Sequence, residues 1–282
     1  MIFYALHVPG VEEERLDLIR AASKKLNIPF KALDPASFDF SKPSPAKKGD
    51  IVYRLSRGKL LRFFEDYIIR PGCATFYSNE IFHKPDPFLL EKHNIPVPKT
   101  VFCVTKDPDR LMAYVKQLGG FPIVLKALGG THGMGVIKID SLSALLSMAD
   151  FLLGQRKLFV LKQFLPVKTS ARFIVLGNRV VTSLEYVATG RDFRTNSAKN
   201  LKVKPKKYSK DFEDLAVRAT QAMGWEFSGV DILIHKNKPY VSEVNFPCNF
   251  VRAQTVAKKD VALEMVKYLR DKSLAIKAKT KR

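Results

Sequence analysis

The sequence predicts an α/β fold that begins with a small parallel sheet and continues with strands that pair through hairpins. Residues 1–80 alternate short apolar strands with helices in the order βαβαβ, and this rhythm implies a small parallel sheet with right-handed crossovers. Later, residues 172–187 form two strands broken at Gly177-Asn178, and residues 230–247 have the pattern of a β-hairpin. We therefore expect a parallel βαβ domain followed by α+β structure.

The expected elements follow from apolar periodicity and from the residues that begin and end helices. Asp107-Pro108 and Ser141 are N-terminal helix signals, and Gly119-Gly120 and Gly154 end the two helices that follow. In chain order we expect strands at 2–8, 30–33, 51–54, 100–104, 121–125, 136–139, 158–161 and 172–187, and helices near 11–27, 58–69, 84–93, 108–119, 142–153, 211–223 and 260–272.

Composition sets outer limits on the kind of protein. The chain has 282 residues, 46% hydrophobic and 27% charged, enough for two ordinary domains or one three-part domain with a sizeable core. No apolar run is long enough to span a bilayer. Residues 1–8 lack a basic region and a cleavage site, so they predict a first strand and not a signal peptide. Three scattered cysteines without a Cys-x-x-Cys spacing argue against a disulfide framework or structural zinc, and predict a cytoplasmic protein.

The formal charge of +21 favours an acidic partner: a polyanion, an acidic protein or peptide, or a phosphorylated substrate. We expect no membrane partner, and nucleic acid is a less favoured alternative. Part of the charge is concentrated between Lys199 and Lys210, where six lysines occur without an acid. This run is either a solvated loop or one wall of an acceptor site that attracts an acidic chain.

Acids and amides replace aliphatic residues in the hairpin between Val230 and Pro247. Glu243 and Asn245 lie two apart on the second strand and must share a face. If the connecting loop has an odd number of residues, Asp231 on the first strand falls opposite Glu243. Two carboxylates and an amide oxygen would then form a set of hard donors suited to Mg²⁺, an ion usually shared with substrate phosphates. The alternative is a hairpin whose polar residues merely face water.

A second candidate feature is the glycine-rich stretch that follows the strand ending at Lys126. Gly129, Gly130, Gly133 and Gly135 make a flexible turn whose backbone N–H groups can approach phosphates. It is neither a P-loop, because no Gly-Lys-Ser/Thr closes it, nor a Rossmann turn, because a strand follows it. Lys126 lies beneath it, in position to meet a phosphate, although such a strand-end lysine is more often solvated.

Four separated segments together carry a family resemblance. They are Phe-Pro-Ile-Val-Leu-Lys-Ala-Leu-Gly-Gly-Thr-His-Gly-Met-Gly at 121–135, Arg-Asp-Phe-Arg-Thr-Asn at 191–196, Gly-Val-Asp-Ile-Leu at 229–233 and Glu-Val-Asn at 243–245. In this order they resemble the ATP-grasp ligases, and within them the RimK-like branch, which joins amino acids to carboxylates. The likeness covers roughly residues 84–270. Residues 1–80 are similar only in their βαβ rhythm.

The resemblance implies an α+β ATP-grasp fold in which two α+β subdomains hold ATP between them. It divides the chain into an N-terminal α/β domain at 1–83, a central subdomain with a glycine-rich lid at 84–162, a C-terminal subdomain with the metal site at 163–272 and a short basic tail at 273–282. We expect the tail to be mobile.

The resemblance also implies roles for individual residues. Lys84 and Lys126 would hold the ATP phosphates beneath a mobile loop that contains Gly130, Thr131, His132, Gly133, Met134 and Gly135. The linker Gln163, Phe164 and Leu165 would touch adenine, and Ser170 and Asn196 would complete the nucleotide site. Arg172 and Arg194 would meet the γ-phosphate and the acyl phosphate. Asp231, Glu243 and Asn245 would hold one or two Mg²⁺, for which Mn²⁺ could substitute.

Some positions depart from the family pattern. An acid usually stands at the positions of Gln163 and Ser170, and the residues after Glu-Val-Asn usually read Ala-Ser-Pro-Gly, where this chain has Phe-Pro-Cys-Asn at 246–249. The expected function is an ATP- and Mg²⁺-dependent carboxylate–amine ligase with an acidic small-molecule, peptide or protein acceptor. The alternatives are a binding protein that docks a polyanion or a ribosome through its basic surface, and an ATP-grasp enzyme that transfers a phosphoryl group without an amine.

Overall fold

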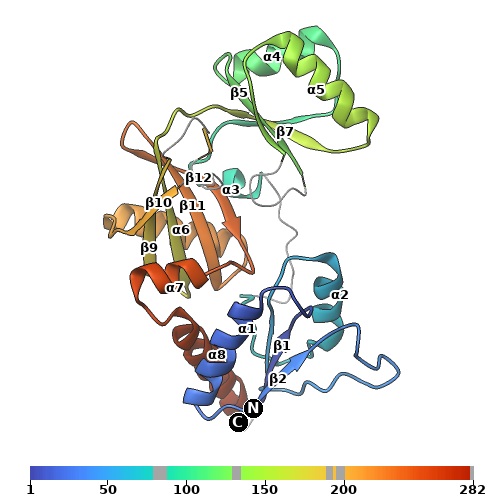
Figure 1. The fold of residues 1–282 in the computed structure, drawn as a ribbon, viewed down its shortest axis with the longest axis vertical. Helices are drawn as coiled ribbons and strands as arrows, with labels where there is room; N and C mark the ends of the chain where they lie inside the picture. Colours follow the sequence, from blue (N-terminus) through green and yellow to red (C-terminus); the bar gives the residue numbers. More distant parts are fainter. Residues whose placement is uncertain (79–87, 129–134, 189–192, 195–200, 280–282) are drawn as a thin grey trace.

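The computed structural model describes residues 1–78, 88–128, 135–188, 193–194 and 201–279, and places their strands in three sheets (Figure 1). One sheet lies in the N-terminal part of the chain, one in the central part and one in the C-terminal part. The central sheet and its two helices stand at one end of the molecule, while the N-terminus and the last described helix lie at the other end. None of the described helices is long and apolar enough to cross a membrane.

The N-terminal sheet is parallel, as the βαβαβ rhythm predicts. Its strand order is β2-β1-β3, with Phe3 level with Phe30 on one side and Ile51 on the other. Separate hydrophobic clusters cover its two faces, one under α1 and one under α2. The elements are β1 (Phe3–Leu6), α1 (Glu13–Lys25), β2 (Phe30–Leu33), β3 (Ile51–Arg54) and α2 (Lys59–Ile68).

The central sheet is antiparallel, with strand order β4-β7-β5-β6 and a hydrophobic core of its own under α4 and α5. The two predicted caps are present: the Asp107 and Ser141 side chains accept from backbone N–H groups three residues ahead. The elements are α3 (Leu89–Lys92), β4 (Thr100–Cys103), α4 (Pro108–Gln117), β5 (Ile123–Ala127), β6 (Val136–Ile139), α5 (Leu142–Gly154) and β7 (Phe159–Gln163). The helix predicted at 84–93 is described only from residue 88, and its regular part is α3.

The C-terminal sheet is antiparallel, with strand order β10-β9-β8-β11-β12. Helix α6 packs against β8, β9, β11 and β12, and α7 packs against β9 and β10. The elements are β8 (Thr169–Leu176), β9 (Arg179–Ala188), β10 (Leu201–Pro205), α6 (Lys210–Ala222), β11 (Phe227–His235), β12 (Lys238–Asn245), α7 (Val251–Ala257) and α8 (Val261–Lys279).

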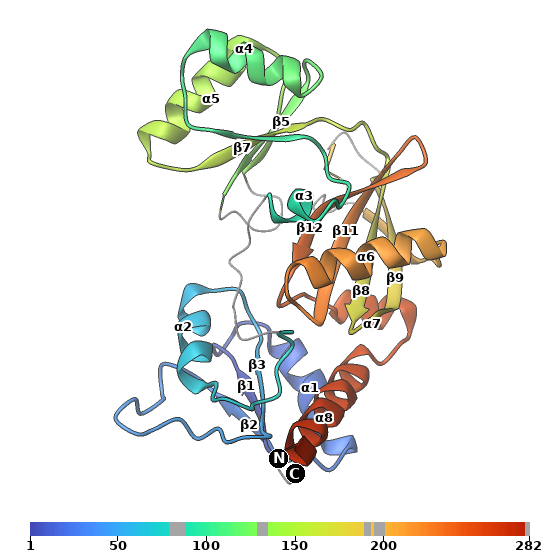
Figure 2. The same cartoon turned by 180° about the vertical axis from the view of Figure 1, so that it is seen from behind.

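The expected mobile tail from residue 273 is wrong as far as the structure describes it, because α8 continues to Lys279. The helix crosses back to the N-terminal domain and lies beside α1 (Figure 2). Ser273 is buried there and its Oγ donates to the carbonyl of Gly49 at 2.5 Å. Lys272 donates to the carbonyls of Thr75 and Tyr77 at 3.0 and 2.9 Å. Burial against the first domain therefore orders a segment whose lysine-rich sequence suggested a free end.

Candidate functional site

The β11–β12 hairpin places Asp231 opposite Glu243, as predicted, but for a different reason. The turn has two residues, Lys236 and Asn237, both with positive φ, which suits a tight type I′ connection. A two-residue turn alone would set Asp231 against Ser242. The register shifts by one between Asp231 and Ile232, so Ser242 is the extra residue of a β-bulge. The bulge thus restores the alignment that the metal hypothesis required.

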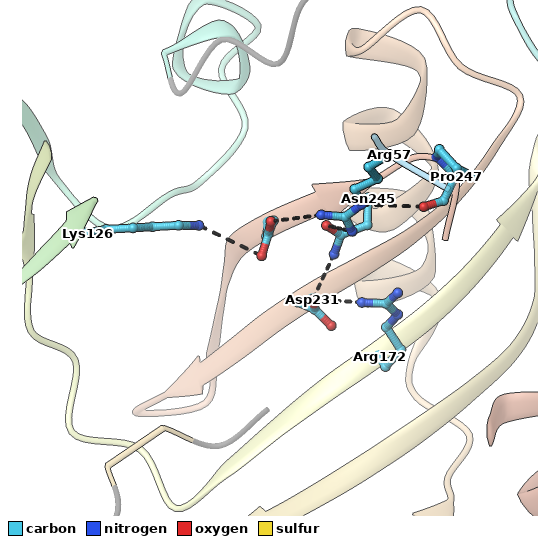
Figure 3. A network of polar contacts seen from close by, with 7 residues as sticks. Arg57, Lys126, Arg172, Asp231, Asn245 and Pro247 are labelled. Atoms are coloured by element: carbon cyan, nitrogen blue, oxygen red, sulfur yellow. Dashed lines mark hydrogen bonds and ion pairs between the residues drawn. The ribbon is translucent and has the colours of Figure 1, made fainter. Parts of the chain in front are cut away.

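The three predicted oxygen donors lie together on one face of this sheet. Figure 3 shows Asp231 and Asn245 side by side, and Glu243 shares their face because it is the register partner of Asp231 and lies two residues before Asn245. Asn245 Nδ2 donates to Asp231 Oδ2 at 3.0 Å, and both residues are buried. Glu243 lies beside them and is 35% exposed at its side chain. In the described part of the chain, no group of three His, Cys, Asp or Glu side chains gathers as a metal site, so a set of three oxygen donors here would need the Asn245 amide. The convergence predicted from the hairpin is confirmed.

Arg172 on β8 is the nearest cation to Asp231. The two residues are register partners, and Arg172 Nη1 donates to Asp231 Oδ2 at 2.7 Å. Burial raises the pKa of Asp231, and the Arg172 charge opposes that shift. Burial would lower the pKa of Arg172, but the Asp231 carboxylate reverses the effect and raises it. The buried arginine therefore stays charged and opposes the protonation of Asp231 that burial favours.

Gly229 explains why this segment reads Gly-Val-Asp. A Cβ built on Gly229 would overlap the guanidinium group of Arg172, which lies across the glycine while it bonds Asp231. Only a residue without a side chain leaves this space. The glycine thus shapes the site without contributing a functional group.

We expect Gly229→Ala to push the Arg172 guanidinium away from Asp231 and to lower the free energy of unfolding by about 1–3 kcal/mol. Binding of Mg-ADP, measured by calorimetry, should weaken as well, because Asp231 loses its fixed partner. Gly154→Ala is the control, because nothing lies within 4 Å of the added Cβ there. Equal stability and equal Mg-ADP affinity in Gly229→Ala and the parent chain would contradict this account.

Lys126, predicted to face the metal residues, does so from the central sheet. It lies near the end of β5, and its Nζ is 3.8 Å from Glu243 Oε2 (Figure 3).

Gly135, which ends the glycine-rich stretch, has φ of 76° and accepts a hydrogen bond from the Ala127 N–H at 2.9 Å. An added Cβ there would lie 3.0 Å from that of Ala127, so a glycine is needed at this strand contact.

Arg57 is a site residue that the sequence analysis missed. It follows β3 in the N-terminal domain, and its Nη2 donates to Asn245 Oδ1. Its Nη1 lies 3.6 Å from Glu243 Oε1, and its Nε lies 3.5 Å from the Pro247 carbonyl oxygen. No motif pointed to it, because it lies 188 residues from Asn245 in sequence. The only sequence signal for a site residue here was the recurrence of basic residues at 54, 57 and 59.

Lys162 on β7 is a second residue that was missed. In the β5–β7 register, Lys126 pairs with Val160 and Val124 with Lys162, so both lysines point to the face opposite the hydrophobic core. Burial, together with the nearby charge of Lys126, lowers the pKa of Lys162 to about 8, while Glu243 opposes the shift. A partly buried lysine beside another lysine favours an anionic ligand on this face.

We expect Lys162→Met to stabilise the ligand-free protein by about 1–3 kcal/mol at pH 7, since it removes a desolvated charge. The folded state holds this proton with a pKa of about 8 and the unfolded chain with one of 10.5. The unfolded state therefore binds more protons between these values, and the penalty should fade as the pH rises from 8 to 10.5.

Denaturant titrations of both proteins across that pH range measure the difference. Lys138→Met is the matched control, because Lys138 lies on the same sheet face but is paired with Asp140 at 2.8 Å. A Lys162→Met effect that does not change with pH would contradict the assignment. The Lys162→Met variant should also bind ADP more weakly. Higher stability combined with weaker ADP binding would identify Lys162 as a ligand-binding residue, because a residue that only packs poorly would change stability alone.

The predicted adenine linker begins where β7 ends, but the side chains at its start divide between two faces. Gln163 pairs with the core residue Ile123, and its side-chain nitrogen lies against Gly119, on the opposite face from Lys126. Phe164 lies beneath Lys138, whose Nζ is 5.4 Å from the ring centre. Leu165 is buried. Any contact of Gln163 with a base on the Lys126 face would therefore use its backbone.

For Ser170 and Arg194, the structure gives the position relative to neighbouring residues of the site. Ser170 is buried on β8, two residues before Arg172, so both side chains share the face of Asp231. Arg194 follows Phe193, whose ring packs edge-on to Phe164 at 6.0 Å. The other predicted nucleotide residues lie outside the described part of the chain: Lys84, Gly130, Thr131, His132, Gly133, Met134 and Asn196.

The idea that the lysine run forms a wall of the acceptor site is not supported at Lys204 and Lys206. Residues 201–205 form β10, and Lys204 pairs with Glu185 on β9. The Lys204 and Lys206 ammonium groups both bond Glu185, which lowers the pKa of this carboxyl. Following the register from β9 to β11, Glu185 and Lys204 point away from the face of Asp231. The missing acid comes from β9, a strand whose pairing with residues 201–205 the sequence did not reveal.

The chemistry of the donor set suits Mg²⁺. The site offers hard oxygens from Asp231, Glu243 and Asn245. Each of these residues already has a cationic neighbour: Arg172 beside Asp231, Lys126 beside Glu243 and Arg57 beside Asn245. In the described residues, no hydrogen bond or ion pair uses Asp231 Oδ1, which leaves this atom available as a ligand. The three cations exceed the two carboxylates, so an added divalent ion requires an anionic partner such as a polyphosphate.

Comparisons with known proteins agree with this geometry. A family model described as the RimK-like ATP-grasp domain matches residues 87–269. A probable alpha-L-glutamate ligase of Rhodopirellula baltica is 30% identical over 89% of this chain and 66% of its own length. The chain thus spans just under two thirds of that relative. A probable alpha-L-glutamate ligase 2 of Pseudoalteromonas atlantica is 30% identical over 76% of this chain and 78% of its own.

Among solved structures, the ATP-grasp ligase PsnB complexed with minimal precursor, Mg and ADP is similar in fold. Its TM-score is 0.73 at 16% identity, with 96% of this chain and 97% of that chain covered. The match therefore includes the N-terminal parallel sheet as well as the two later sheets. The sequence matches and the shared fold show that this chain belongs to the RimK-like ATP-grasp family.

Proposed function

We propose that the chain is an ATP- and Mg²⁺-dependent ligase that joins a carboxylate to an amine through an acyl phosphate. One observation carries the proposal: two carboxylates and an amide on the C-terminal sheet meet cations from all three parts of the chain. These are Arg57, Lys126 and Arg172. Such a set suits phosphoryl oxygens, on which both steps of this reaction build charge.

The two steps need no nucleophile from the protein. An oxygen of the substrate carboxylate attacks the γ-phosphorus, the bond from that phosphorus to the ADP oxygen breaks, and acyl phosphate forms. The amine nitrogen then attacks the acyl carbon, phosphate leaves, and the nitrogen gives its proton to water. Asp231, Glu243 and Asn245 would hold one or two Mg²⁺, which supply charge neutralisation at the phosphates. Lys126 would hold the phosphates, and Arg172 would face the transferred group.

An acidic acceptor is supported by the relatives and by the net charge of +21. Both sequence relatives are named as glutamate ligases, and PsnB is described with a precursor. The lysines of β10 do not add to this support, because they bond Glu185 on the far face. Free cysteines at 73, 103 and 248 are compatible with a reducing cytoplasm.

A binding protein without chemistry is the weaker alternative. Such a relative would have no reason to keep all three oxygen donors, a glycine that makes room for Arg172 and a β-bulge that aligns Asp231 with Glu243. Phosphoryl transfer without an amine would use the same residues, and only the product distinguishes it from ligation.

The test is ATP turnover by the full chain with Mg²⁺ or Mn²⁺ against a panel of acids paired with amino acids, including glutamate and glutamate-ended peptides. A ligase releases equal amounts of ADP and phosphate and makes a product heavier by one residue, as read by mass spectrometry. A phosphorylated acid without an amide product would support phosphoryl transfer. ATP binding with no ADP release for any pair would support the binding protein.

A further inference from the structure

The Arg57 side chain reaches the metal residues from the N-terminal domain and lies opposite Lys126. Lys126 enters the site from one side and Arg57 from the other (Figure 3). Their contacts with Glu243 use different oxygens: Oε2 for Lys126, at 3.8 Å, and Oε1 for Arg57, at 3.6 Å. If Lys126 marks the phosphate side of the site, Arg57 lies on the side from which an acceptor approaches.

The backbone around Arg57 is firmly held although its side chain is 43% exposed. Arg54 Nη1 donates to the Ser56 carbonyl at 2.8 Å, and Arg15 donates to the carbonyl of Leu55. Arg54 is itself fixed by Glu65, through a 2.7 Å bond from its Nε. A cation on a fixed loop with a partly exposed side chain is typical of a ligand-binding group, because little order has to be gained on binding.

The partners of Arg57 in the described residues are the groups that a metal would use. It bonds Asn245 Oδ1 and contacts Glu243, and its remaining contact is the Pro247 carbonyl, 3.5 Å away. A divalent cation at the same oxygens would repel the guanidinium. Arg57 would then need another anion, and its planar fork of donors matches a carboxylate in two parallel bonds.

We propose that Arg57 is the carboxylate-recognition residue of the acceptor site, released from Asn245 when metal binds and then paired with the acid that is to be activated. The inference rests on the proposed function and adds to it a residue outside the family motifs. In-line transfer requires the attacking oxygen to approach the γ-phosphorus from the side opposite ADP. Arg57 would hold that oxygen's carboxylate there, on the side away from Lys126.

Three variants of the full chain test this: Arg57→Met, Arg57→Lys and the control Lys59→Met. The control removes an equal charge two residues away, from an exposed side chain. With the acid that supports ADP release, Arg57→Met should raise the Michaelis constant for the acid by about 10- to 100-fold. The constant for ATP should stay within about twofold. Arg57→Lys should recover only part of the loss, because an ammonium group lacks the fork.

The second readout needs no turnover. Mn²⁺ titrated into the protein with ADP present, followed by electron paramagnetic resonance, should bind several-fold more tightly to Arg57→Met than to the parent chain. The control should bind it like the parent. Unchanged Mn²⁺ affinity, or a Michaelis constant for ATP that rises as much as that for the acid, would overturn the proposal. If no acid supports turnover, the proposed function fails, and the Mn²⁺ titration alone decides whether Arg57 occupies the metal position.

Discussion

Glu243→Gln should lower ATP turnover at least about 100-fold while the protein stays folded. Glu243 is the most exposed of the three oxygen donors and is the residue best able to meet both a metal and a phosphate. Its loss removes one of two carboxylates that would bind the divalent ion, and such an ion contributes several kcal/mol to stabilising a phosphoryl transition state. The neutral amide keeps the shape of the side chain but not its charge.

Stability should change by no more than about 1 kcal/mol, because the contacts of Glu243 are long and half-exposed. They measure 3.8 Å to Lys126 and 3.6 Å to Arg57, and Arg57 keeps its bond to Asn245. Steady-state ADP release and thermal unfolding measure the two effects. Glu264→Gln is the matched control, since Glu264 pairs with Arg179 on the surface and away from the site. Turnover like that of the parent chain would remove Glu243 from the metal site.

Glu65→Leu should give the largest loss of stability, about 3–5 kcal/mol. Glu65 is 1% exposed and accepts from Arg54 Nε at 2.7 Å and from the Tyr77 hydroxyl at 2.6 Å. Burial raises the pKa of Glu65, and Arg54 and Tyr77 oppose that shift by bonding the ionised form. Without this carboxylate, a charged arginine stays buried with the Ser56 carbonyl and the Tyr77 hydroxyl as its polar partners.

A double-variant cycle isolates this effect from packing. Arg54→Met combined with Glu65→Leu removes both charges, and such replacements of a buried pair are often neutral. The double variant should therefore regain most of the lost free energy in denaturant unfolding. Because Arg54 also holds the loop before Arg57, the double variant should remain less active than its stability suggests. A double variant that is no more stable than Glu65→Leu would show that the pair does not account for the loss.

Local patterns in the sequence were enough for the parallel βαβ start, the two helix caps and the shared sheet face of Glu243 and Asn245. These depend on the spacing of neighbouring residues, which periodicity and cap chemistry determine directly. The motifs at 121–135, 191–196, 229–233 and 243–245 also carried the family resemblance, which the comparisons confirmed. The correct facing of Asp231 and Glu243 was predicted from an odd loop, whereas the chain uses an even turn and a bulge at Ser242.

Contacts between distant segments could not be read in this way. Arg57 joins the site because the N-terminal domain packs against the C-terminal sheet in one continuous core. Lys162, and not the side chain of Gln163, reaches the Lys126 face because of the β5–β7 register. Glu185 neutralises the β10 lysines only once β9 lies beside them.

The sequence by itself therefore determined which residues could do chemistry on phosphates, because those residue types occur at short, characteristic spacings. The tertiary structure alone decided which cations surround them and on which face each side chain lies. The physical reason is that charge interactions depend on distance in space. Strand register sets that distance, and a single extra residue moves the side chains beyond it to the other face of the sheet.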